Sequence, residues 1–156
     1  MNVRDPNPTA IEPVRVTARV RRSAQEAFKL FTENVNTWFP LERFNFGGTQ
    51  TVDVRIEPLV GGRFYERYVD GREHTNGTVV VWDPPHFVVF TWGGEDWSAP
   101  TEVAVRFVSE GPQLTRVEVE HRDWDRLGIE GARLRDAYNN GWPTVIAAYA
   151  ALAGAA

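Results

Sequence analysis

Two ionisable side chains lie on apolar faces of predicted strands, where they could carry out acid–base catalysis. Glu66 lies between Phe64 and Tyr68 in RFYERYV, and His121 shares one strand face with Val119 in LTRVEVEH. Apolar surroundings disfavour the charged form of an ionisable group, which is how a general acid or base is poised near neutral pH. If these two faces are the concave ones, Glu66 and His121 are the candidate catalytic residues.

A structural role is the alternative for both residues, and it is the one that we favour. Buried charges are usually paired, so Glu66 could pair with Arg63 or Arg106. His121 could simply end its strand at the rim of the sheet. The sequence by itself leaves the catalytic and the structural alternatives open.

Other kinds of catalytic site find no support in the sequence. The three histidines, His74, His86 and His121, are far apart, show neither HxH nor HExxH spacing, and have no cysteine to assist them. No GxSxG motif is present, and none of the double glycines is followed by the lysine of a phosphate-binding loop. We therefore expect no metal ion and no cofactor.

Aromatic residues are the strongest compositional signal, with six tryptophans and nine phenylalanines. Most should belong to the core, but a pocket for an apolar ligand is lined by the same residue types. Trp97 differs because it follows Glu95 and Asp96 in a polar loop, so we expect it at a cavity mouth or a partner contact. The candidate ligand-binding residues are Trp38, Phe64, Glu66, Trp82, Phe90, Trp92, Trp97, His121, Tyr138 and Trp142.

The elements that must position these residues begin with a strand and two short helices. VRVTARV, from Val14, alternates apolar and polar residues as a half-buried strand does. Ser23 and Glu26 form a capping box ahead of a helix from Ala24 to about Phe31. A short second turn is predicted over 36–39.

Six further strands follow, separated by turn residues. Gly61-Gly62 and Asp70-Gly71 mark tight hairpins, and no helical pattern interrupts the series, so an antiparallel meander is predicted rather than βαβ units. The predicted strands are TVDVRIE, RFYERYV, EHTNGTVVVW, HFVVFTW, TEVAVRFV and LTRVEVEHR.

A long helix is predicted from Gly131 to about Ala153. Its apolar residues recur every three or four positions along one face. That face comprises Leu134, Tyr138, Trp142, Val145, Tyr149 and Leu152. Pro143 removes one helical hydrogen bond, so either the helix kinks near Trp142 or Pro143 begins a second helical segment.

The composition indicates one α+β domain. A chain of 156 residues, 42% of them hydrophobic, is large enough for a single core, and we assign 14–156 to the domain and 1–13 to a flexible tail. The net charge of −4 argues against binding to nucleic acid. The lack of cysteine and of any long apolar segment leads us to expect a cytoplasmic protein without a membrane span. We expect it to be either a monomer or a homodimer. Lys29 is the only lysine, and the resulting arginine bias hints at a bacterial source.

The order of these elements and several motifs resemble the START-like helix-grip superfamily, also called SRPBCC. Within it the chain resembles the proteins named after the activator of the heat-shock-protein ATPase (AHSA-type). The motifs that carry the resemblance are RVTARVRRSAQEAFKLFT, TWFP, VGGRF, GTVVVWDPPHFVVFTW, LTRVEVEH and the GW of the last helix. The resemblance implies a sheet curved around the C-terminal helix, with an apolar cavity between them.

Three functions are compatible with that fold, since fold does not determine function. The first is a binding domain that holds a small apolar molecule in the cavity. The second is a protein-interaction module like the family's co-chaperones, using the outer sheet or the Trp97 loop. The third is an enzyme of the cyclase or hydrolase kind that uses Glu66 or His121 in the cavity.

Overall fold

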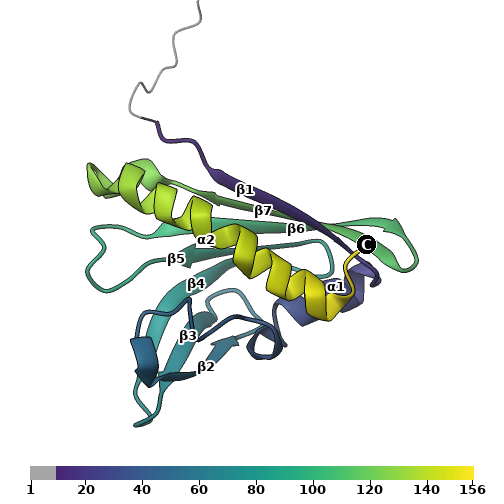
Figure 1. Cartoon of the computed structure of the whole chain (residues 1–156), viewed down its shortest axis with the longest axis horizontal. Coiled ribbons are helices and arrows are strands. Elements are labelled where there is room, and N and C mark those ends of the chain that lie inside the picture. Colours follow the sequence, from purple (N-terminus) through teal and green to yellow (C-terminus); the bar gives the residue numbers. More distant parts are fainter. Residues whose placement is uncertain (1–9) are drawn as a thin grey trace, which may run out of the picture.

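The computed structural model describes residues 10–156, so most of the predicted tail lies outside the described residues. A seven-stranded sheet carries a long helix across one face (Figure 1). The elements are β1 (Val14–Val20), α1 (Ala24–Phe31), η1 (Val35–Thr37), η2 (Gly48–Gln50), β2 (Thr51–Ile56), β3 (Arg63–Tyr68), β4 (Glu73–Asp83), β5 (Phe87–Trp92), β6 (Thr101–Gly111), β7 (Leu114–Arg122), η3 (Trp124–Leu127) and α2 (Glu130–Ala153). The α+β helix-grip prediction is confirmed.

The strands pair in the order β1-β7-β6-β5-β4-β3-β2, and every pairing is antiparallel. The predicted meander therefore runs unbroken from β2 to β7, and β1 joins it beside β7, with Val14 opposite His121 and Val20 opposite Thr115. Because alternate residues of β7 are buried, Thr115 and His121 face the inside of the curved sheet.

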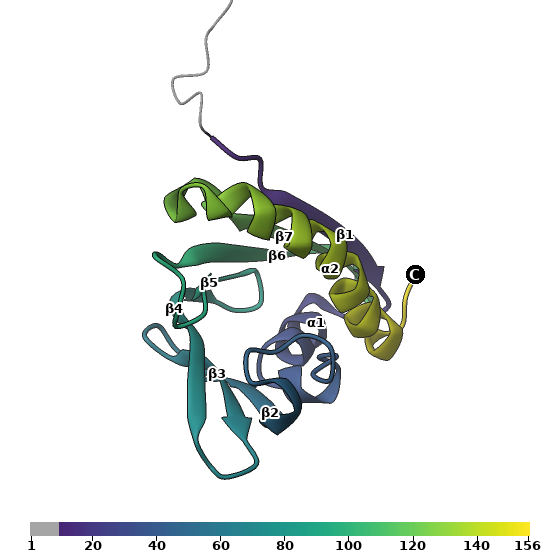
Figure 2. The same ribbon diagram turned by 60° about the vertical axis from the view of Figure 1, so that its left-hand side comes forward.

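The sheet is strongly curved, so that β2 and β3 turn away from β1 and β7 and enclose one side of the molecule (Figure 2). An irregularity in the β3–β4 pairing falls next to Phe64, which pairs with Gly77. A Cβ atom added at Gly77 would lie 1.6 Å from the Thr91 carbonyl oxygen, so only glycine permits this close approach of two strands. The bulge is one source of the curvature that makes room for a helix.

Helix α1 forms as its sequence predicts. The Ser23 hydroxyl accepts the Glu26 amide, and the Glu26 carboxylate accepts the Ser23 amide, which completes the capping box. Phe28 and Phe31 project from the buried face of the helix, and both make edge contacts with Phe107 of β6. Helix α1 thereby fills one end of the space inside the sheet.

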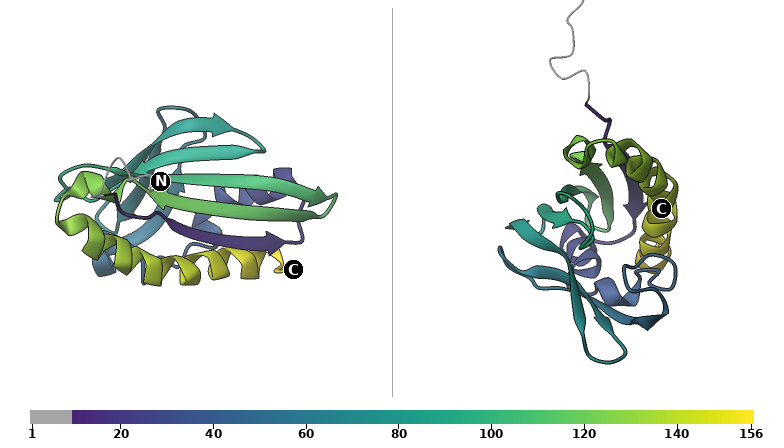
Figure 3. Two further views of the ribbon diagram at one scale, coloured as in Figure 1. Left: turned by 90° about the horizontal axis from the view of Figure 1, so that it is seen from above. Right: turned by 90° about the vertical axis from the view of Figure 1, so that its left-hand side faces the viewer.

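Helix α2 is continuous from Glu130 to Ala153, although it contains Pro143. Of the two alternatives for Pro143, the one in which it begins a second helical segment is therefore wrong. The proline lies on the exposed side, and the helix is bowed along its length (Figure 3). Gly154 ends the helix in the left-handed conformation, with φ of 93°. The last residues then bridge to β1 through Val20 and Ala155.

The described helices include none that is both long enough and apolar enough to cross a membrane.

Candidate functional site

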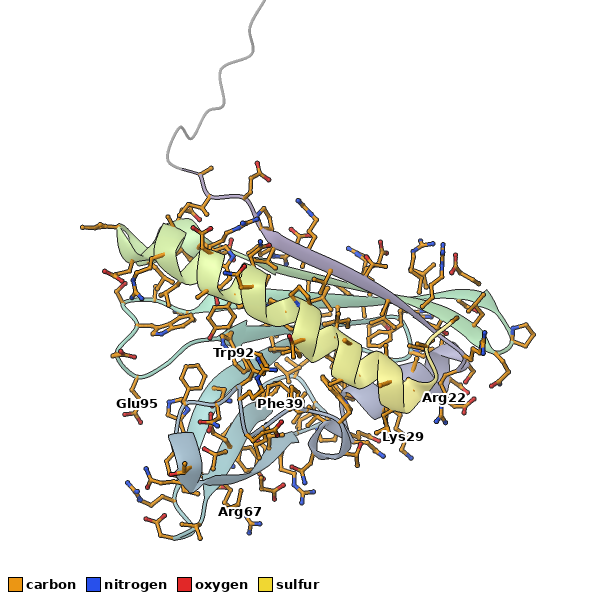
Figure 4. All side chains as sticks on the ribbon, in the orientation of Figure 1. Arg22, Lys29, Phe39, Arg67, Trp92 and Glu95 are labelled. Atoms are coloured by element: carbon orange, nitrogen blue, oxygen red, sulfur yellow. The ribbon has the colours of Figure 1, made fainter. Side chains whose placement is uncertain are left out.

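A cavity of about 250 Å³ lies between α2 and the curved sheet. Aromatic rings form most of its wall, and we call it the aromatic cavity. It is lined by Phe31, Val35, Trp38, Phe39, Arg43, Phe44, Asn45, Phe46, Phe64, Phe90, Trp92, Ala137, Tyr138, Gly141, Trp142 and Val145. Figure 4 shows Trp92 and Phe39 beneath α2, on the side that faces the strands.

The front wall is the segment 43–46, which has no regular secondary structure and is held by a buried carboxylate. Glu66 is fully buried and accepts the amide protons of Phe46 (2.8 Å) and Gly47 (3.2 Å). It also accepts the hydroxyl proton of Thr51 (2.6 Å). Hydrogen bonds to a charged acceptor are stronger than neutral ones, so one carboxylate fixes the position of this wall.

The contacts of Glu66 are structural, but its partners are not the expected arginines. Both carboxylate oxygens are occupied by backbone and hydroxyl donors, and Glu66 does not line the aromatic cavity. The expected arginine pairing is wrong, because Arg63 pairs with Glu57 and Glu73, and the Arg106 guanidinium lies over the Phe87 ring. The buried charge is balanced by amide and hydroxyl protons instead.

The back wall is held by a chain of hydrogen bonds through His121, which is fully buried. The Trp142 indole donates to Nδ1 of His121 (3.0 Å), so the imidazole carries its proton on Nε2. That proton goes to the Thr101 hydroxyl (2.7 Å), which donates in turn to the Trp92 carbonyl (3.0 Å). Burial lowers the pKa of His121 to about 3. The ring is therefore neutral at pH 7, and it links α2 to the sheet.

One residue that lines the cavity, Tyr138, has a hydroxyl proton that the described residues do not use. The indole N–H of Trp92 donates to the Tyr138 hydroxyl oxygen (2.9 Å). The Tyr138 hydroxyl proton has no acceptor among residues 10–156. Burial raises the pKa of Tyr138 to about 12, so the phenol stays protonated at neutral pH and can donate a hydrogen bond.

Six of the ten candidate ligand-binding residues line the aromatic cavity. They are Trp38, Phe64, Phe90, Trp92, Tyr138 and Trp142. Trp38 comes from the segment after α1, Tyr138 and Trp142 from α2, and the others from β3 and β5. The structure thus brings together residues that are far apart in the sequence, while ligand binding by any of them stays a prediction.

The other four candidates lie outside the cavity wall. Glu66 and His121 sit behind the wall, in the hydrogen-bonded positions described above. Trp82 lies at the α1 end of the sheet, with its ring 5.0 Å from that of Phe28. Trp97 is half-buried and packs edge-on against Tyr138, with ring centroids 5.8 Å apart, so it supports the wall from outside.

The residues that sequence reasoning missed come mainly from the segment 43–46 and from the small positions of α2. Irregular chain carries no periodicity, so nothing in the sequence indicated that Phe44 or Phe46 turns inward. Ala137 and Gly141 were passed over because the apolar period emphasises large residues. One signal was available. Ala137 and Gly141 are four residues apart, so they share one face of the helix, and each directly precedes an aromatic residue of the predicted face.

No group of three or more histidine, aspartate or glutamate side chains converges as a metal site within residues 10–156.

Comparison with known proteins identifies one matching family. The family described as activator of Hsp90 ATPase homolog 1-like protein matches residues 21–154. No curated protein matches the chain.

Similar solved structures include two that share more than 30% sequence identity with the chain. An anthrahydroquino-gamma-pyrone synthase is 31% identical, with a TM-score of 0.62, and the match covers 92% of this chain and 98% of that one. CalC from Micromonospora echinospora, a self-sacrificing resistance protein, is 33% identical, with a TM-score of 0.64 and coverage of 88% and 91%. An HSP90 activator from Plasmodium falciparum, 20% identical with a TM-score of 0.58 and coverage of 86% and 90%, shares the fold alone.

Proposed function

The chain belongs to the activator of Hsp90 ATPase homolog 1-like family, and from that premise we propose that residues 14–156 bind a planar aromatic molecule that bears a carbonyl group. The ligand sits in the aromatic cavity between α2 and the sheet. Its carbonyl oxygen accepts the free hydroxyl proton of Tyr138. The observation that carries the proposal is that a residue lining this aromatic cavity, Tyr138, keeps a hydroxyl proton that residues 10–156 do not use.

The shape and lining of the cavity support an aromatic ligand. A dry apolar cavity of roughly 150 Å³ takes up benzene, so about 250 Å³ accommodates a ring system larger than a single ring. The rings of the wall meet in tilted and edge-on arrangements, such as Phe64 with Trp92 at 5.0 Å between centroids. Such a wall presents both ring faces and ring edges to a planar ligand.

The polar groups support a ligand with one oxygen inside and polar atoms near the mouth. Tyr138 offers one neutral donor from the back wall. Arg43 lines the front of the cavity and is exposed, so it can contact a ligand group that reaches solvent. Apolar walls with a few placed donors are the usual design of a small-molecule site.

The two relatives above 30% identity support a small-molecule role. One is a synthase whose name describes a fused, oxygenated ring product, and the other is a resistance protein. The ligand class proposed for this chain agrees with the first of these names. The same comparison leaves an enzymatic role as a second candidate, with Tyr138 in place of Glu66 and His121 as the group that would touch the substrate.

A co-chaperone role is the remaining candidate, and the family description favours it. The Trp97 loop gives it little support, because Trp97 packs against Trp124 and Tyr138 rather than facing solvent alone. Recovery of a stoichiometric chaperone from lysate by the wild-type protein, together with no small-molecule binding, would favour this candidate over ours.

The proposal is tested by titrating the protein with 2-acetylnaphthalene and following tryptophan fluorescence. We expect saturable 1:1 binding that Ala137→Trp weakens by at least about tenfold, because Ala137 is an exposed residue of the cavity lining and a ring placed there obstructs the opening. The matched control is Ala147→Trp, an exposed alanine of the same helix that does not line the cavity. Equal affinity of the two variants would contradict the proposed site.

A further inference from the structure

A second, polar depression lies on the other side of Phe46. It is open to solvent, has a volume of about 630 Å³, and shares only Phe46 with the aromatic cavity. Its lining residues are Phe46, Tyr68, Arg72, Glu73, His74, Gly94, Glu95 and Asp96. The proposed ligand of the aromatic cavity uses none of its polar groups.

His74 presents a hydrogen-bond acceptor to this depression. Only 7% of the residue is exposed, and its Nδ1 lies 2.7 Å from the Asn76 side-chain oxygen, so Nδ1 carries the proton and donates it. Its Nε2 atom has no partner among the described residues. The imidazole ring also packs against Phe46, with ring centroids 4.9 Å apart, which fixes its orientation. A buried histidine held in this way offers the Nε2 lone pair to a donor.

The charges around His74 are predominantly negative. Glu95 and Asp96 lie on the loop between β5 and β6, both are exposed, and neither forms an ion pair among residues 10–156. Figure 4 shows Glu95 projecting outward from this loop. The one cation in the lining, Arg72, is already bonded to Asp70 and Gln50. The depression therefore keeps an excess of uncompensated carboxylate.

The raised pKa of Tyr68 agrees with that negative potential. Burial raises the pKa of this phenol, and the carboxylates of Glu66 and Glu95 raise it further. The Tyr68 and Phe46 rings both line the depression, and aromatic rings attract a cation that lies over their faces.

We propose that this depression is a second binding site, distinct from the aromatic cavity, for an organic cation in which a primary ammonium group is joined to a small aryl group through a saturated carbon. The ammonium donates a hydrogen bond to His74 Nε2. Glu95 and Asp96 supply the opposite charge, and the aryl group lies against Phe46 and Tyr68. A neutral aryl alcohol keeps a hydrogen-bond donor but lacks the positive charge, and an aryl carboxylate lacks both.

The experiment is a titration of the full chain with benzylammonium at pH 8, observed in the NMR signals of the His74 ring. We expect a saturable shift that benzyl alcohol reproduces at least about fivefold more weakly and phenylacetate does not reproduce. Raising the salt concentration should weaken the binding, because Glu95 and Asp96 are exposed.

Two sets of variants separate the charge from the hydrogen bond. Glu95→Gln/Asp96→Asn should weaken benzylammonium at least about fivefold, whereas the control Glu33→Gln/Glu42→Gln, which changes two exposed carboxylates elsewhere, should not. His74→Gln, followed through the ring signals of Tyr68 because the His74 signals are lost, should weaken it about three- to tenfold. No shift with benzylammonium, or the same shift with phenylacetate, would overturn the proposal.

Binding of benzylammonium can be tested independently of the function proposed above. Binding of 2-acetylnaphthalene should be unchanged in Glu95→Gln/Asp96→Asn, because neither residue lines the aromatic cavity. A protein that binds benzylammonium but not 2-acetylnaphthalene would support this second site and overturn the first. The reverse pattern would do the opposite.

Discussion

The two halves of α2 are built from the same kinds of residue but have different surroundings. In the C-terminal half, Ile146, Tyr149 and Ala150 are buried and pack into the main core that also holds α1. In the N-terminal half, Tyr138 and Trp142 are only partly buried and line the aromatic cavity. Helix α1 fills the space below one half, whereas the irregular segment 43–46 lies opposite the other half and reaches the helix through Phe44, beside Gly141. The element opposite the helix therefore decides whether an aromatic face becomes core or cavity wall.

The tyrosines in the two halves show the same difference at the level of single atoms. The Tyr149 hydroxyl donates to the Ala27 carbonyl (2.8 Å), so its proton is used within the protein. The Tyr138 hydroxyl accepts from Trp92 and keeps its own proton free within residues 10–156. A satisfied hydroxyl contributes to stability, whereas an unsatisfied one inside a cavity is available to a ligand.

The largest effect that we expect is on the pH dependence of stability, and it comes from His121, which links the N-terminal half of α2 to the sheet. Its pKa is 6.5 in the unfolded reference and about 3 in the folded protein, because burial disfavours the charged ring. Between these values the unfolded chain binds the proton and the folded protein does not, so stability falls as the pH drops below about 6.5 and is unaffected above it. At pH 5 the loss attributable to His121 is about 2 kcal/mol relative to pH 8.

Urea unfolding of the wild type and of His121→Gln at both pH values checks this, since the variant should lack the additional loss. If the variant does not fold, the wild-type His121 ring can be followed by NMR instead, and its signals should stay those of a neutral imidazole at pH 5. Protonation of the folded ring near pH 6 would contradict the tight packing of this anchor.

A smaller effect separates the two tyrosines under the same substitution. Tyr149→Phe removes the hydroxyl hydrogen bond to the buried Ala27 carbonyl and should cost about 1 kcal/mol of unfolding free energy, with no change in ligand preference. Tyr138→Phe should abolish the preference for 2-acetylnaphthalene over its isostere 2-isopropenylnaphthalene, which we expect to be about three- to tenfold in the wild type.

Denaturant titrations and fluorescence titrations of both variants provide the measurements. An equal change of ligand preference in Tyr149→Phe and Tyr138→Phe would contradict the difference between the two halves of α2.

Elements with a strong local signal could be predicted from the sequence. The Ser23–Glu26 capping box located α1, and alternation together with turn residues located the strands, because these signals depend on neighbours in the chain. The helical period also predicted which side of α2 faces the sheet, except at Leu152, which is 47% exposed. Pro143 misled the expectation of a second segment, since an exposed proline costs one hydrogen bond that packing of the rest of the helix offsets.

The candidate site could be predicted only in part, because its front wall depends on long-range contacts. Phe44 and Phe46 point inward since Glu66, on a strand some twenty residues away, captures the backbone of the segment. Likewise, the role of His121 depends on Trp142 and Thr101, which no spacing rule connects. The alternation of apolar residues in the strands predicted that Glu66 and His121 face inward, but it could not predict their hydrogen-bond partners, which are distant in the sequence.

The most direct test of the central claim is to locate 2-acetylnaphthalene by isotope-filtered NOE measurements on the labelled protein. The ligand should show contacts to the rings of Trp92, Tyr138 and Trp142, which line the cavity half, and none to Phe107 or Tyr149, which belong to the packed half. Contacts only to exposed side chains, or contacts to Tyr149 and Phe107, would contradict the assignment of the N-terminal half of α2 as the ligand-binding wall.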